Sequence, residues 1–279
     1  MSATLNFAIN RISASRQPFP AFAAMCQRLG ISAIEIRNDL PGVELQDGTP
    51  ASDIGAIARD HGLRIRSINA LYPFDVFNAE RAEQASRLAD YAAACGAEAL
   101  VMCPLNSWQD ERNAAQRAAG LVQALEGLRP ILRSRGLTGL VEPLGFEECA
   151  LRQKSLAVQA IQAIGDDGTF RLVHDTFHHH LAGEDTFFPE LTGLVHISGV
   201  EDLDLGVNQM RDGHRVLVGD ADRLGNLPQL RRLLDLGYTG LVSFEPFAES
   251  VATAADIEAQ LAASMAFIRE GVAALATAA

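Results

Sequence analysis

The sequence predicts a single (β/α)8 barrel spanning residues 1–279. Eight short apolar runs alternate with longer helical patterns along the chain, an order that implies parallel strands joined by right-handed crossovers. Glycine follows the last residue of several helical patterns, as at Gly30, Gly62 and Gly96, where a left-handed residue commonly ends a helix. No linker or low-complexity segment divides the 279 residues, an ordinary length for one such barrel.

The expected strands are apolar nearly throughout, which is typical of strands covered on both faces. They are Leu5–Asn10, Ala33–Arg37, Arg64–Ala70, Ala99–Pro104, Gly139–Leu144, Arg171–Asp175, Leu194–Gly199 and Leu241–Pro246.

Seven helical patterns lie between or after these runs. They are Ala21–Leu29, Ser52–His61, Ala79–Cys95, Asn113–Arg135, Ser155–Ile164, Leu227–Leu236 and Ile257–Ala276. The segment after the sixth strand has little helical signal, and Thr186–Leu191 is the expected helix there.

The composition favours a protein that acts on small molecules. The chain has 35 acidic and 23 basic residues and a net charge of −12, which disfavours binding to a nucleic-acid backbone. No stretch has the apolar length of a membrane span. The four cysteines have no metal-type spacing, so we expect free thiols in a reducing compartment, the cytoplasm.

Four late strands carry acidic or histidine side chains near their carboxyl ends, where the active site of a barrel lies. These residues are Glu142, Asp175, His196 and Glu245. Each interrupts an apolar run, where an unpaired charge is costly. One divalent ion (Mn, Co, Mg or Zn) would offset all four, and three carboxylates with one imidazole suit such ions. For any one of these residues alone, the alternative is an inward-pointing ion pair with an arginine.

The segment from Arg171 to His180 joins one of these ligands to a run of three histidines. Asp175 is expected at the end of its strand, and His178 on the loop just beyond, facing the same cavity. We expect His178 to form a hydrogen bond with a substrate oxygen. The alternative is that the three histidines form a polar turn with no role.

Such a site supports proton transfer next to a ketone. A divalent ion polarises a carbonyl group and acidifies the adjacent C–H bond. Glu142 and Glu245, whose strands lie on either side of those that carry Asp175 and His196, are the expected acid–base couple, moving a proton through a cis-enediol.

These strand ends resemble those of the xylose isomerase-like family of barrels, which includes sugar epimerases, hydroxypyruvate isomerase, inosose dehydratase and endonuclease IV. The resemblance is carried by Leu140-Val-Glu-Pro143, His174-Asp-Thr-Phe-His178, Val195-His-Ile197 and Ser243-Phe-Glu-Pro246. It implies that the four residues named above hold one divalent metal. Within the family the chain is most similar to the 2-keto-myo-inositol isomerases, through segments such as Ala33–Arg37 and Ile68–Leu71.

The resemblance also implies residues that contact the substrate. Arg215 matches an arginine used near the substrate, the alternative being an ordinary surface ion pair. Asn69 belongs to one of the similar segments. Tyr72 and Trp108 follow the third and fourth strands, so they either wall the pocket or pack as ordinary aromatic residues.

The sequence departs from the family near the substrate. It has Leu194 where related epimerases often carry a second histidine, Ser198 where the inosose isomerases carry an acid, and Gly219-Asp-Ala221 in place of a Gly-x-Gly. These differences leave the metal ligands unchanged.

The expected function is therefore metal-dependent isomerisation or epimerisation of a keto-polyol, with 2-keto-myo-inositol (an inosose) foremost. An inosose dehydratase, a ketose 3-epimerase and a hydroxypyruvate-isomerase-type enzyme are the alternatives on the same site. A non-catalytic sugar-binding barrel would not need both glutamates, and the acidic charge argues against a DNA-repair enzyme. No nucleic acid or membrane is expected as a partner; a homo-oligomer is compatible with the sequence.

Overall fold

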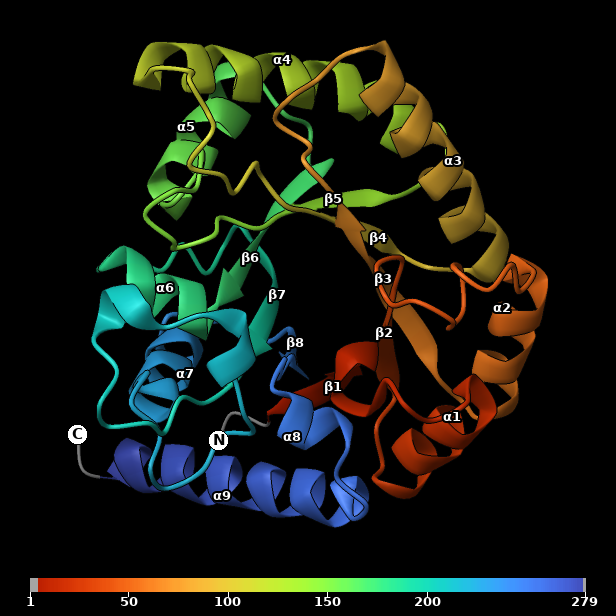
Figure 1. The fold of residues 1–279 in the computed structure, drawn as a ribbon, viewed down its shortest axis with the longest axis vertical. Helices are drawn as coiled ribbons and strands as arrows, with labels where there is room; N and C mark the ends of the chain where they lie inside the picture. Colours follow the sequence, from red (N-terminus) through yellow and green to blue (C-terminus); the bar gives the residue numbers. More distant parts are fainter. Residues whose placement is uncertain (1–4, 278–279) are drawn as a thin grey trace.

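Eight parallel strands close into a barrel in the computed structural model, which describes residues 5–277 (Figure 1). The strands follow one another around the barrel in chain order, and the last pairs with the first, with Ala8 opposite Ser243. Their bounds are β1 Asn6–Asn10, β2 Ala33–Arg37, β3 Arg64–Leu71, β4 Ala99–Met102, β5 Thr138–Val141, β6 Phe170–Asp175, β7 Thr192–Ile197 and β8 Leu241–Phe244. The predicted fold class is confirmed, and the strand bounds differ from expectation by three residues or fewer.

Helices surround the barrel (Figure 1). The α-helices are α1 Phe19–Arg28, α2 Ala51–Asp60, α3 Ala79–Cys95, α4 Ala114–Arg133, α5 Lys154–Ala163, α6 Thr176–Ala182, α7 Asn226–Asp235, α8 Glu249–Ala252 and α9 Ile257–Thr277. Three short 3-10 helices are η1 Arg11–Ala14, η2 Val207–Gln209 and η3 Asp212–His214. Asn113 begins α4 with a capping box in which its side chain and that of Gln116 bond each other's backbone N–H.

The helix after β6 lies earlier than the sequence suggested. No helix forms at Thr186–Leu191; instead α6 begins directly after β6. Asp175 caps it, because its Oδ1 accepts hydrogen bonds from the backbone N–H of Phe177 at 2.7 Å and of His178 at 3.1 Å. Gly183, with φ of 61°, ends it. His178 therefore lies on a helix rather than a loop, and it is buried rather than part of an exposed turn.

Side chains on each strand alternate between the barrel interior and the surrounding helices. Leu140, Val173 and Leu194 form part of a separate apolar cluster of the interior, whereas Val141, Leu172 and Val195 belong to the main core shared with the helices. The next interior position on each of these strands lies two residues further on, nearer the carboxyl end, and these positions are polar: Glu142, Asp175 and His196. The apolar layer thus forms the floor beneath a polar layer.

Two expectations from composition can be compared with the structure. The four cysteines Cys26, Cys95, Cys103 and Cys149 are free, as expected. Among residues 5–277, none of the helices combines the length and the apolar character that crossing a membrane requires.

Candidate functional site

Four side chains from consecutive strands meet at the carboxyl end of the barrel. Asp175 ends β6 and His196 lies in β7. Glu142 and Glu245 directly follow β5 and β8, and their backbone N–H groups still bond the neighbouring strands, to Met102 at 3.1 Å and Ile197 at 2.8 Å.

Each of these residues offers one ligand atom, and the four atoms lie within 4.8 Å of one another. Oxygen or nitrogen ligands about 2.1 Å from a shared ion lie at most about 4.2 Å apart, so only small shifts separate this arrangement from a coordination sphere. His196 Nδ1 already lies 2.9 Å from Glu142 Oε1 and 3.2 Å from Glu245 Oε2. All four residues are buried. The donor set therefore fits a divalent metal ion.

The second imidazole nitrogen of His196 faces another carboxylate. Nε2 lies 3.1 Å from both carboxylate oxygens of Glu35, which is fully buried. Metal-binding histidines commonly have such a partner, which fixes the ring and raises its basicity. Ser67, Asn69 and Ser243 donate hydrogen bonds to the Glu35 carboxylate and hold it in place.

The electrostatics of these buried groups are strongly coupled. Burial alone would lower the pKa of His196, but the carboxylates of Glu245, Glu35 and Glu142 raise it well above its usual range. Burial would likewise raise the pKa of Glu35, yet the charge and hydrogen bond of His196 bring it to about 2. The cluster therefore concentrates negative charge around the imidazole. These buried carboxylates need a nearby positive charge, which a bound cation would also supply.

Two arginines hold Glu245 in position. Arg37 Nη1 lies 2.8 Å from Glu245 Oε1, and Arg215 Nη2 lies 3.0 Å from Glu245 Oε2 and 2.7 Å from Asp175 Oδ2. Burial opposes ionisation of Glu245, but the charges of His196, Arg215 and Arg37 outweigh it and lower its pKa. Arg215 is 1% exposed, so it is a buried partner of two candidate ligands. Its Nη1 also lies 3.2 Å from the half-exposed Asp212.

A cavity of about 320 Å³ opens beside these carboxylates. Glu142, Glu245, Arg215, Asn69 and His178 are among the residues that line it. The Nδ1 atom of His178 is buried and has no hydrogen-bond partner, so it is available to a ligand in this cavity. Edge-on contacts with Phe146 and Phe177, at 5.1 Å between ring centroids, fix the imidazole plane.

The structure separates the two aromatic candidates. Tyr72 lines the cavity and is 43% exposed. Trp108 is 67% exposed on the segment after β4 and is not among the residues that line the cavity. Only Tyr72 is therefore positioned to wall the cavity in this conformation.

Several residues of the site were given no role from the sequence. Glu35 lies in the apolar run Ala33–Ile36, and that signal is the same one that pointed to the four candidate ligands. Cys103 Sγ donates to Glu142 Oε2 at 3.4 Å. Phe247 lies against both Arg37 and Arg215, at 4.9 and 4.7 Å from ring centroid to guanidinium carbon. No sequence pattern indicated a role for Cys103 or Phe247.

Comparison with known proteins agrees with the fold. The family model described as "Xylose isomerase-like TIM barrel" matches residues 23–271. A solved xylose isomerase domain-containing protein from Salmonella typhimurium is 33% identical, with a TM-score of 0.88, covering 96% of this chain and 99% of that one. No curated protein matches the chain.

More distant structures share the fold. The IolI protein, solved with a zinc atom bound, has 20% identity and a TM-score of 0.83, covering 96% of this chain and 98% of its own. D-psicose 3-epimerase from Clostridium cellulolyticum, solved with D-tagatose, has 14% identity and a TM-score of 0.75, covering 96% and 99%.

Proposed function

Because the chain belongs to the xylose isomerase-like TIM barrel family, we propose that it is a metal-dependent isomerase or epimerase of a keto-polyol. The substrate proposed is 2-keto-myo-inositol, converted to an isomeric keto-inositol. The similarity of segments such as Ala33–Arg37 and Ile68–Leu71 to the 2-keto-myo-inositol isomerases supports this substrate, and the zinc-bound relative supports a divalent metal.

The observation that carries the proposal is the convergence of Glu142, Asp175, His196 and Glu245 within 4.8 Å at the carboxyl end of the barrel. These residues would hold the ion. When bound, it would polarise the ketone of the substrate and acidify the neighbouring C–H bond. A binding protein without chemistry would have no need for two buried glutamates beside the same cavity.

Glu142 and Glu245 are the proposed acid–base couple. Both line the cavity, so one can take a proton from the carbon next to the ketone and the other can return a proton to the enediol. Their surroundings differ. Glu245 contacts two guanidinium groups, whereas Glu142 contacts the Cys103 thiol and His196. Glu245 is thus held more firmly as the anion, and Glu142 is the better candidate for the first proton transfer.

The remaining residues bind and orient the substrate. The unpartnered Nδ1 of His178 is proposed to bond a substrate hydroxyl or ketone oxygen. Arg215 uses Nε for Ser198 at 2.9 Å and Nη2 for the two carboxylates. Its Nη1 donates to Asp212 Oδ1 at 3.2 Å. The main task of Arg215 is therefore to position Asp175 and Glu245.

The test is a substrate panel. The metal-loaded protein is incubated with 2-keto-myo-inositol, other inososes, D-psicose and hydroxypyruvate, and the products are identified by NMR. We expect conversion of the inosose to an isomer of equal mass. A product that lacks one water would indicate a dehydratase, and turnover of D-psicose alone would indicate a ketose epimerase. No turnover of any ketone would contradict the proposal.

Glu35 is expected to tune the metal site through His196. Replacing Glu35 with Gln should weaken metal affinity by about 10–100-fold, as other losses of a histidine's carboxylate partner do. Competition with a fluorescent chelator measures this affinity. Ser67→Ala removes one hydrogen bond to Glu35 but keeps its charge, so it should have a smaller effect. Equal affinities for wild type and Glu35→Gln would show that Glu35 does not act on the metal.

A further inference from the structure

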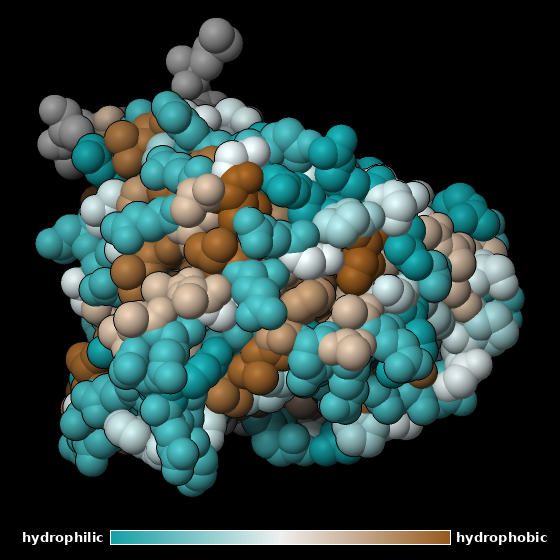
Figure 2. All heavy atoms as spheres, turned by 90° about the horizontal axis from the view of Figure 1, so that it is seen from above, coloured by the Kyte–Doolittle hydropathy of each residue, from teal (hydrophilic) through white to brown (hydrophobic). Residues whose placement is uncertain are grey.

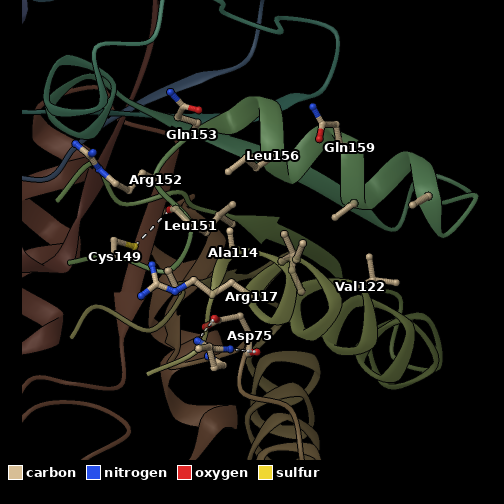
Figure 3. Close-up of a pocket in the computed structure, with 16 residues that line it drawn as sticks. Asp75, Ala114, Arg117, Val122, Cys149, Leu151, Arg152, Gln153, Leu156 and Gln159 are labelled. Atoms are coloured by element: carbon tan, nitrogen blue, oxygen red, sulfur yellow. Dashed lines mark hydrogen bonds and ion pairs between the residues drawn. The ribbon is translucent and has the colours of Figure 1, made fainter. Parts of the chain in front are cut away.

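A second and larger cavity lies outside the barrel, between α4 and α5. Its volume is about 740 Å³, within the range of small-molecule sites. Figure 3 shows α5 and α4 along its two sides, with Leu156 and Gln159 on α5 and Arg117 and Val122 on α4. In Figure 2, which looks at the molecule from the α4 side, apolar side chains gather between hydrophilic ones. We call this cavity the α4–α5 groove.

The body of the groove is apolar. Its floor includes the buried residues Leu121, Leu151 and Ala160. Val122 and Leu156 add to the walls, and Leu156 is 45% exposed. Because water in such a groove gains few hydrogen bonds, displacing it with an aliphatic group is favourable.

One end of the groove is cationic. Arg112, Arg117 and Arg152 line it against one acid, Asp75, in a chain whose net charge is −12. Arg112 is fully paired, with Asp75 and Asp110 both at 2.8 Å. The other two arginines are not. Figure 3 shows Arg117 and Arg152 toward the end of the groove where the loop before α5 runs, with Cys149 and Leu151 of that loop between them.

Arg152 donates to the carbonyl oxygens of Gly145, at 2.9 and 3.1 Å, and of Leu181, at 3.3 Å. Within residues 5–277 no carboxylate lies within 4.0 Å of its guanidinium. Arg117 Nε is 3.0 Å from Asp110 Oδ2, but in a direction that leaves this buried N–H without a hydrogen-bond acceptor. The groove thus ends in positive charge that nothing in the described chain fully satisfies.

We propose that the α4–α5 groove binds a small amphipathic anion, with its aliphatic body between the helices and its carboxylate at Arg117 and Arg152. Arg117 Nη2 donates to Asp110 O at 3.3 Å, and Arg152 uses Nε and Nη2 for carbonyl oxygens. The unpartnered Nε of Arg117 and Nη1 of Arg152 remain for a ligand, and a hydrogen bond from a guanidinium to a carboxylate is strong because both groups are charged. The adjoining wall matches a hydrocarbon chain. A second copy of the chain is a poorer occupant, because two chains of net charge −12 repel. The site is separate from the candidate metal centre and independent of the function proposed there.

Binding is measured by isothermal titration calorimetry on the full chain, with octanoate as the probe and octanol and acetate as comparisons. Octanoate should bind at least about tenfold more tightly than either comparison, because only it presents both a charge and an aliphatic body. Arg152→Gln and Arg117→Gln should each weaken octanoate binding by about tenfold. Arg59→Gln, an exposed arginine of α2 outside the groove, is the matched control and should bind octanoate like the wild type.

Ala118→Phe tests the location without changing charge. Ala118 is an exposed groove residue of α4, so the larger side chain fills the groove while the fold is retained, which a melting curve checks. Octanoate binding should be lost. Octanoate binding that survives Ala118→Phe, equal binding of octanol, or no octanoate binding at all would overturn the proposal. A wild-type dimer in sedimentation that Ala118→Phe dissociates would also overturn it, since the groove would then be an interface.

Discussion

Glu142→Gln and Glu245→Gln are each expected to lower the turnover of 2-keto-myo-inositol by about 10²–10⁴-fold, the usual cost of losing a general acid or base. Glutamine keeps the size of the side chain and one oxygen, but it cannot accept a proton. Steady-state rates on metal-loaded protein measure the effect, and metal content per chain is determined on the same samples.

The matched control is Glu147→Gln, an exposed glutamate in the same segment between β5 and α5. It should turn over like the wild type. Near-normal rates in both active-site variants, with metal content unchanged, would mean that the two-glutamate mechanism is wrong. A rate loss in step with metal loss would instead assign these residues to metal binding alone.

His196→Ala is expected to abolish stoichiometric metal binding and, with it, activity. His196 is the one nitrogen ligand among the four candidate metal ligands, and its Nδ1 lies within 3.2 Å of two of the other three. Protein stripped with EDTA and reloaded should retain about one metal ion per chain in the wild type and far less in the variant, as measured by mass spectrometry of the metal.

Removing His196 also leaves Glu35 buried without its imidazole partner, which destabilises the fold on its own. His196→Asn, which is polar and smaller, and a melting curve of each metal-free variant separate this effect from metal loss. His61→Ala, remote at the end of α2, is the matched control. Full metal retention in a folded His196 variant would remove His196 from the ligand set.

The barrel and its four candidate ligands were predictable because both depend on local patterns. Apolar runs mark strands covered on both faces, and a charged residue within such a run, as at Glu142 or Asp175, must face something that offsets it. Fixed barrel geometry then brings the ends of neighbouring strands together. The same reasoning extends to Glu35, which also interrupts an apolar run and proves to be the partner of His196.

The missed features depend on contacts between distant segments or on one residue with two tasks. Asp175 both ends a strand and caps α6, so the histidines after it looked like a turn although they begin a helix. Three partners of Arg215, namely Ser198, Asp175 and Glu245, come from three different strand ends, and no pattern in the irregular segment after β7 indicates them. The α4–α5 groove likewise arises from how two helices are spaced, which neither helix encodes alone.

Deuterium exchange tests the central claim most directly. The metal-loaded protein is incubated with 2-keto-myo-inositol in D2O, and NMR follows the hydrogen on the carbon next to the ketone. We predict that the recovered substrate gains deuterium at that carbon and that the isomeric product gains it at the carbon that was the ketone of the substrate. EDTA-stripped protein should catalyse neither exchange nor isomerisation, and Glu142→Gln should slow the exchange by about 10²-fold or more. Isomer formation without any deuterium from solvent, or exchange that persists unchanged in the stripped protein, would contradict metal-assisted proton transfer at this site.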